Sequence, residues 1–261
     1  KKKAYRASDY DHVMEKVEWV WENIPKRDAR TFCLAMYCYC KSGRAKRAYD
    51  VWEQLLEYLL GSDNSEKERV DARSFKMLVN ALSTQNDTDF SEKIDAVITG
   101  MWKLHEAGYY DTAPNVFLVT TAMNSWAKHG NVDRVKRLVH DLETRYQTLK
   151  WKSLKADAAV YNALIHAIRN QEDIANAADE AGSVVKLMER NGVMPDTITC
   201  NTLMDVCLAS NTKKGRERAE QTLMRMVEGF KRGNARVKPS LKSFSSLIHA
   251  WSDADSPARA E

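Results

Sequence analysis

Apolar residues recur every three or four positions along most of the chain, which is the spacing of an amphipathic α-helix. Short stretches rich in Gly, Asp, Asn and Ser interrupt this pattern, so the helices are short. One helix opens in GVMPDTITCNTLMDVC (192–207), where Pro195 breaks the preceding segment and Asp196 can cap the next one. Asn201 is then a polar residue in the first turns of an otherwise apolar helix.

The opening of this helix recurs along the chain. Related openings follow Asp28, Asp71, Asn115, Asp157 and Ser240, which with Asp196 makes six copies. The copies are spaced by about 40 residues, which indicates a helical-repeat protein. The predicted first helical residues are Ala29, Ala72, Val116, Ala158, Thr197 and Leu241.

A second amphipathic segment follows each full copy, at 44–60, 91–108, 131–146, 174–192 and 215–233. We name the first helix of each pair helix A and the second helix B. Stacked antiparallel pairs of this kind form an α-solenoid with a long concave surface. The predicted repeats are 29–71, 72–115, 116–157, 158–196 and 197–240, with a partial repeat or cap over 1–28 and a truncated sixth repeat over 241–261.

Composition agrees with an all-α fold, because the chain is 44% hydrophobic and has only 10 Gly and 5 Pro among 261 residues. The net charge of +4 is a mild basic excess that is compatible with nucleic-acid binding. No apolar run approaches the ~20 residues that a membrane-spanning helix requires. The charge and composition therefore leave the function open.

No motif predicts an enzyme, a metal site or a cofactor site. The five cysteines, which lie inside predicted helices, lack the short paired spacing of a structural zinc site. We interpret them as free thiols in a reducing compartment. No nucleophile motif, phosphate-binding Gly loop or paired-carboxylate constellation is present, so we expect no catalysis and no cofactor.

Taken together, the copies resemble the pentatricopeptide repeat family. The resemblance rests on a Pro-Asp or similar break followed by a polar residue at the fifth helical position, in VMPDTITCNTLM, LKADAAVYNALI and VKPSLKSFSSLI. The links CKSGR (40–44) and AKHGN (127–131) between paired helices also match that family. Tetratricopeptide repeats are shorter, at ~34 residues, and their signature is missing here. The resemblance implies a right-handed α-solenoid of helix-turn-helix repeats.

It also implies modular binding of single-stranded RNA, with one base per repeat. In that family the base is selected by the fifth residue of helix A and the last residue of the same repeat. On this sequence the pairs are Thr120 with Asp157, Asn162 with Asp196, and Asn201 with Ser240. These pairs resemble the family's guanine, uracil and cytosine types, so the implied core preference is G-U-C.

The two N-terminal repeats fit this scheme less well, because they pair Cys33 with Asp71 and Lys76 with Asn115. A thiol is a poor hydrogen-bonding group, and a lysine more readily contacts a phosphate. Ser245 is the fifth residue of the truncated repeat. The second residues of helix A, which pack against bases or contact the backbone in the family, are Arg30, Arg73, Phe117, Ala159, Ile198 and Lys242.

The resemblance implies a role in mitochondrial or plastid RNA processing, stability or translation, or in an organellar ribosome. Two alternatives stay open: a protein-binding scaffold, and a ribonucleoprotein component that contacts RNA without a base code. The residues that end each repeat are also good helix N-caps, so capping alone can account for their recurrence.

Overall fold

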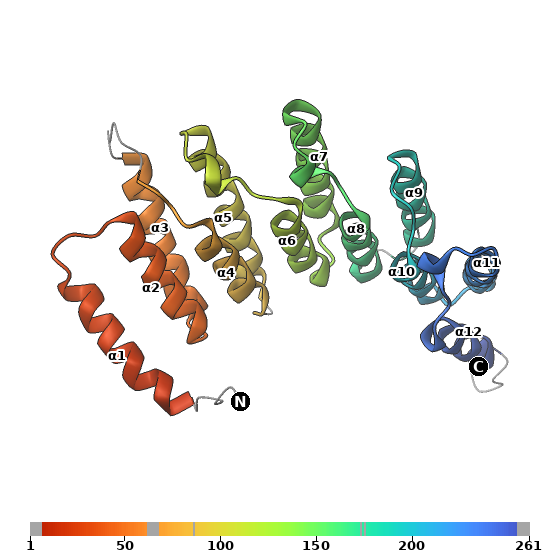
Figure 1. Cartoon of the computed structure of the whole chain (residues 1–261). Coiled ribbons are helices and arrows are strands. Elements are labelled where there is room, and N and C mark those ends of the chain that lie inside the picture. Colours follow the sequence, from red (N-terminus) through yellow and green to blue (C-terminus); the bar gives the residue numbers. More distant parts are fainter. Residues whose placement is uncertain (1–6, 62–67, 86, 173, 175, 255–261) are drawn as a thin grey trace. The chain divides into compact units, whose positions relative to one another are not determined.

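The computed structural model describes residues 7–61, 68–85, 87–172, 174 and 176–254. Over these residues the chain forms helices and no strand, which confirms the all-α repeat fold (Figure 1). The chain divides into two compact units, Lys1–Ala122 and Met123–Glu261. The boundary between them falls inside helix α6 (Val116–Lys128).

The first unit contains one single helix, two helical hairpins and the start of α6. α2 packs against α3 and α4, and α4 packs against α5. α1 ends just before Pro25, whose ring is incompatible with a helix interior. The elements are α1 (Ala7–Asn23), α2 (Ala29–Lys41), α3 (Ala45–Gly61), α4 (Ala72–Ser83), α5 (Thr88–Glu106) and the short η1 (Tyr110–Thr112).

The second unit continues the same alternation. The A helices α8, α10 and α12 contact one another in succession, and the B helices α9 and α11 pack against α8 and α10. The elements are α7 (Val132–Leu149), η2 (Lys152–Leu154), α8 (Ala158–Asn170), α9 (Ala177–Arg190), α10 (Thr197–Ala209), α11 (Lys213–Lys231), η3 (Ala235–Val237) and α12 (Leu241–Ala254).

The six A helices begin at the residues that the repeat pattern predicted. The residue before each helix accepts a hydrogen bond from a backbone N–H in the first turn, which confirms its capping role. A side-chain cap of this kind stabilises a helix by about 1 kcal/mol. The capping residues are Asp28, Asp71, Asn115, Asp157, Asp196 and Ser240. The division into repeats stays a prediction.

Apolar side chains fill the space between paired helices in each unit. In the first unit Leu55 and Phe75 are fully buried, and in the second unit Met204, Met226 and Leu247 belong to one buried cluster. The cysteines are free, and burial raises the pKa of Cys40 and of Cys200 to about 11. Within the described residues, no helix is both long enough and apolar enough to span a membrane.

The link between α6 and α7 requires a glycine at position 130. Gly130 has φ +66°, a left-handed conformation that residues with a Cβ rarely adopt. A Cβ on Gly130 would also lie 2.4 Å from the backbone oxygen of Asn170. The glycine therefore lets the C-terminal end of α8 approach this turn closely.

Candidate functional site

Asn162 on α8 and Asp196, the N-cap of α10, are joined directly. Asn162 Nδ2 donates to Asp196 Oδ1 at 3.3 Å, and Thr199 Oγ1 lies 2.7 Å from Asn162 Oδ1. Thr199 also closes a capping box with Asp196, whose Oδ1 accepts the Thr199 backbone N–H at 2.8 Å. An amide, a carboxylate and a hydroxyl thus form one cluster between two successive A helices.

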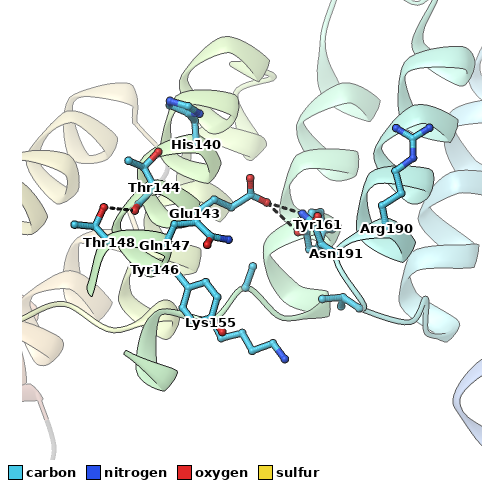
Figure 2. A pocket seen from close by; sticks show the side chains of 12 residues that line it. His140, Glu143, Thr144, Tyr146, Gln147, Thr148, Lys155, Tyr161, Arg190 and Asn191 are labelled. Atoms are coloured by element: carbon cyan, nitrogen blue, oxygen red, sulfur yellow. Dashed lines mark hydrogen bonds between the residues drawn. The ribbon is translucent and has the colours of Figure 1, made fainter. Parts of the chain in front are cut away.

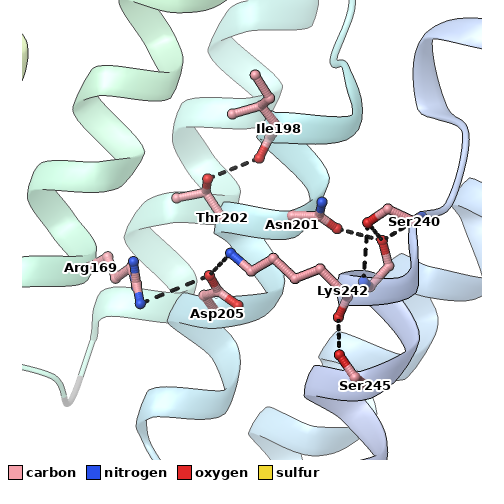
Figure 3. Close-up of polar contacts among 9 residues, drawn as sticks. Arg169, Ile198, Asn201, Thr202, Asp205, Ser240, Lys242 and Ser245 are labelled. Carbon is pink, nitrogen blue, oxygen red and sulfur yellow. Dashed lines mark hydrogen bonds and ion pairs between the residues drawn. The ribbon is translucent and has the colours of Figure 1, made fainter.

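The next pair of A helices repeats this arrangement with serines (Figure 3). Ser243 Oγ donates to Asn201 Oδ1 at 2.7 Å and lies 3.1 Å from Ser240 Oγ. The backbone N–H of Ser240 donates to Ser243 Oγ at 3.0 Å. Asn201 and Ser240 are therefore linked through Ser243 rather than directly.

Cys33 occupies the corresponding place on α2, but it is only 7% exposed. Burial raises the pKa of the Cys33 thiol, and a hydrogen bond with the Ser74 side chain acts in the opposite direction. Asp71 caps α4, and its hydrogen bond from the Arg73 side chain holds the pKa of that carboxyl below its usual range. Cys33 and Asp71 thus both have partners within the first unit.

Lys76 on α4 is exposed, and its ammonium group lies over the ring of Phe117, 4.7 Å from the centroid. This is the geometry of a cation–π contact. The predicted partner of Lys76 is Asn115, whose Oδ1 accepts the Leu118 backbone N–H at 3.1 Å. The lysine covers a face of Phe117, which is the second residue of the following A helix.

Thr120 lies in the first unit and Asp157 in the second, so the surroundings of each side chain are described separately. Thr120 is 7% exposed, and its hydroxyl donates to the Val116 carbonyl at 2.8 Å. Asp157 is exposed and accepts the backbone N–H groups of Ala159 and Val160. Thr120 already uses its hydroxyl proton within its own helix.

The second residues of the A helices are exposed. Phe117 is 50% exposed and Ile198 is 62% exposed, which is high for apolar side chains. Arg73 is held by Asp71, and Ser245 donates to the carbonyl of Lys242 at 3.2 Å. The exposed second residues are Arg30, Arg73, Phe117, Ala159, Ile198 and Lys242.

Asp205 on α10 links three successive A helices (Figure 3). Its Oδ2 lies 3.1 Å from Lys242 Nζ on α12 and 3.9 Å from Arg169 Nη2 on α8. The Asp205 side chain is 14% exposed, so the carboxylate is largely enclosed. Sequence reasoning did not assign Asp205 to the site, because its two partners are distant in sequence.

An open pocket of about 540 Å³ lies between α7 and the α8–α9 hairpin (Figure 2). Glu143 Oε1 accepts hydrogen bonds from the Tyr161 hydroxyl and from Asn191 Nδ2, both at 3.0 Å. Burial raises the pKa of Tyr161. None of the predicted base-selecting side chains lines this pocket, and its polar contacts tie the helices of the second unit together.

The part of the chain that the structure describes contains no group of three or more His, Cys, Asp or Glu side chains that could hold a metal ion.

Comparison with protein families gives two matches. A model described as "Pentatricopeptide repeat domain" matches residues 146–208 and 183–254, and one described as "PPR repeat" matches 30–58. Together they cover just over half of the chain. The chain belongs to the pentatricopeptide repeat family. The matched residues of this pentatricopeptide repeat chain include both asparagine clusters and Cys33.

Among solved structures, the chain is similar to the pentatricopeptide repeat protein PPR10 in complex with an 18-nt psaJ RNA element, with 16% identity and a TM-score of 0.46 over 95% of this chain and 30% of that chain. A second structure, of the pentatricopeptide repeat protein PPR10 from maize, gives 15% identity and a TM-score of 0.41 over 94% of this chain and 34% of that chain. The chain spans about a third of the length of these solved chains. No curated protein sequence matches it.

In this pentatricopeptide repeat chain, the third residue of helix A is the feature that sequence reasoning missed. Ser74, Thr199 and Ser243 occupy that position, and each contacts the fifth residue of the preceding A helix. A local signal was present, since a polar side chain three residues after an N-cap can close a capping box, as Thr199 does with Asp196. Its contact with a neighbouring repeat could not be inferred from that motif.

Proposed function

We propose that this pentatricopeptide repeat chain binds single-stranded RNA with sequence selectivity and acts in organellar RNA metabolism, in a mitochondrion or plastid. Its role there would be in RNA processing, RNA stability, translation or ribosome assembly. Family membership supports this proposal, because one repeat of this class reads one base. The chain acts in this proposal by binding, without catalysis and without a cofactor.

The hydrogen bond between Asn162 and Asp196 is the observation that carries the proposal. It joins the two side chains that the family scheme assigns to one base. Asn162 Nδ2 keeps a second N–H, and Asp196 keeps its Oδ2. A donor beside an acceptor matches the edge of uracil, where a carbonyl oxygen lies next to the N3–H.

Asn201 and Ser240 offer a different combination of groups. The Asn201 amide presents its N–H donors, and the Ser240 hydroxyl, whose proton faces Ser243 Oγ here, becomes a second donor when it turns toward a base. Cytosine presents two adjacent acceptors, N3 and O2, so two donors match it. With Thr120 and Asp157 assigned to guanine by family analogy, the proposed core preference is G-U-C.

The two N-terminal repeats, 29–71 and 72–115, have a different role in this proposal. Cys33 is too enclosed to reach a base edge, whereas Lys76, Arg30 and Arg73 are exposed cations. Exposed cations attract phosphates regardless of sequence. We therefore assign the two N-terminal repeats to backbone contact, as in a ribonucleoprotein that holds RNA without a base code.

Binding of short single-stranded RNAs across a series of salt concentrations tests the proposal. One oligomer contains GUC, and its control has the same composition with the triplet scrambled. We expect tighter binding of the GUC oligomer, and an affinity that falls with salt with a slope of about −0.7 per neutralised phosphate. Equal affinity for both oligomers would remove the base code, and failure to bind any RNA would favour the protein-binding scaffold.

A further inference from the structure

Some A helices carry a hydroxyl side chain at their third position, and others carry an apolar side chain there. Thr199 and Ser243 carry a hydroxyl there, and each contacts the side-chain amide at the fifth position of the A helix before it. Ser74 also carries a hydroxyl, but it donates to the Asp71 carbonyl at 2.6 Å, and the preceding fifth residue is the thiol Cys33. We propose that the hydroxyl of Thr199 and of Ser243 orients the base-selecting amide of the preceding repeat, and so acts as a positioning residue for RNA recognition. The inference rests on the proposed function and names residues outside the family's base-selecting pair.

The hydrogen bonds of Thr199 fix the direction of its hydroxyl proton. The backbone N–H of Asp196 donates to Thr199 Oγ1 at 3.2 Å, so this oxygen acts as an acceptor there. Its own proton then points toward an acceptor, and Asn162 Oδ1 at 2.7 Å is closer than Asp196 Oδ1 at 2.9 Å. The amide of Asn162 is thereby held with its oxygen toward Thr199.

Ser243 produces the same orientation in Asn201 with a different set of atoms. The backbone N–H of Ser240 donates to Ser243 Oγ, and the Ser243 hydroxyl donates to Asn201 Oδ1 at 2.7 Å. The nitrogen of Asn201 points away from Ser240 (Figure 3), and within the described residues it has no hydrogen-bond partner. Two repeats therefore present amide N–H groups rather than the amide oxygen.

Without a hydroxyl at the third position, the amide oxygen loses its donor, and an amide that rotates by half a turn exchanges donor for acceptor. In Asn162 only the longer bond from Nδ2 to Asp196 Oδ1, at 3.3 Å, then opposes this rotation. In the fixed orientation, the amide N–H groups can bind only a base that places a hydrogen-bond acceptor opposite them. A flipped amide presents its oxygen instead and would accept a base with a donor there. The hydroxyl thus acts on discrimination between bases, since phosphate contacts supply most of the sequence-independent affinity.

The chain also shows that the hydroxyl is dispensable for the fold. Leu118 and Val160 occupy the third position of α6 and α8, and both are buried. The fifth residues of the preceding A helices, Lys76 and Thr120, make other contacts, with the Phe117 ring and the Val116 carbonyl. Val160 shows that a valine is accepted at this place in the repeat.

The variants Thr199→Val, Thr199→Ser and Thr31→Val test the inference on the whole chain. Thr199→Val keeps the side-chain volume and removes the hydroxyl, whereas Thr199→Ser keeps the hydroxyl. Thr31→Val is the matched control, because Thr31 closes the same capping box with Asp28 at the start of α2, and within the described residues its side chain bonds to Asp28 and to no amide of another repeat. The probes are RNAs containing GUC, or GCC in its place.

We expect the wild-type chain and Thr199→Ser to prefer uracil by roughly 5- to 100-fold, as one well-placed base contact allows. Thr199→Val should lower this preference at least about threefold while changing the affinity for the GCC oligomer little. Thr31→Val should keep the full preference. In nitrogen–proton NMR spectra, the side-chain amide signals of Asn162 should shift in Thr199→Val and stay in place in Thr31→Val.

An unchanged uracil preference in Thr199→Val, with the wild-type chain discriminating, would overturn this inference and leave the proposed function standing. An equal loss of affinity for both oligomers would also overturn it, because the hydroxyl would then support binding rather than selection. If the wild-type chain binds no RNA, the proposed function fails first and the inference fails with it.

Discussion

Lys242 Nζ lies 3.1 Å from Asp205 Oδ2, so a residue at the start of α12 is held by a carboxylate on α10. The same oxygen lies 3.9 Å from Arg169 on α8. Both cations are partly exposed, with side-chain exposures of 62% and 43%. Asp205, which shares α10 with Asn201, therefore offsets positive charge on α8, the helix of Asn162, and on α12.

Asp205→Asn should increase RNA affinity, because it removes an anion and leaves Lys242 and Arg169 available to phosphates. Each additional neutralised phosphate steepens the dependence of log affinity on log salt by about 0.7. Fluorescence anisotropy with one RNA at several salt concentrations measures both effects. Asp141→Asn, which makes the same charge change at an exposed site on α7, is the control and should alter neither quantity. Weaker binding by Asp205→Asn would contradict the expectation.

Asn201→Ala should reduce discrimination at a single base and preserve the fold. The substitution leaves the Ser243 hydroxyl without its amide acceptor, which costs about 1 kcal/mol in the free energy of unfolding. Binding to RNAs varied at one position, together with urea unfolding, separates the two effects. Asn124→Ala, at an exposed site on α6, is the control. Loss of the folded state in Asn201→Ala would assign Asn201 to structure.

Gly130→Ala should destabilise the chain by about 1–3 kcal/mol, since alanine at φ +66° is strained and its Cβ would meet the Asn170 backbone. Gly182→Ala is the matched control inside α9. A Cβ there meets nothing within 4 Å, and alanine is the better helix former by about 0.5–1 kcal/mol. Urea unfolding should therefore shift in opposite directions for the two variants, and a shift in the same direction would rule out this explanation.

The features that depend on local chemistry could be predicted from the sequence. Each A helix begins after a capping residue, and Pro195–Asp196 marks such a start without reference to any distant residue. The contacts between repeats could not be predicted in this way. Thr199 bonds to Asn162 and Lys242 bonds to Asp205, and each partner lies 37 positions earlier in the chain. Neither contact therefore leaves a local pattern in the sequence. The candidate base-selecting pairs could be named from the family resemblance. Their hydroxyl partners and Asp205 could be identified only from the way the helices pack in the structure.

The cap of α2 makes part of the stability depend on pH. Hydrogen bonds from the Thr31 side chain and backbone hold the pKa of Asp28 below its ordinary value. A depressed folded-state pKa means that the unfolded chain binds the proton more readily. The stabilisation is therefore fully present above the unfolded pKa of about 3.9, and it is lost as the pH falls through the lower folded pKa.

Asp28→Asn should remove this contribution to the pH dependence, because asparagine is also a good N-cap and does not titrate. Urea unfolding between about pH 2 and 6 measures the stability of both proteins. Other carboxylates titrate in both, so they cancel in the difference between the two curves. We expect the wild-type advantage to shrink as the pH falls below about 4. A difference that stays constant over this range would show that the Asp28–Thr31 hydrogen bonds do not distinguish the charged from the neutral carboxyl.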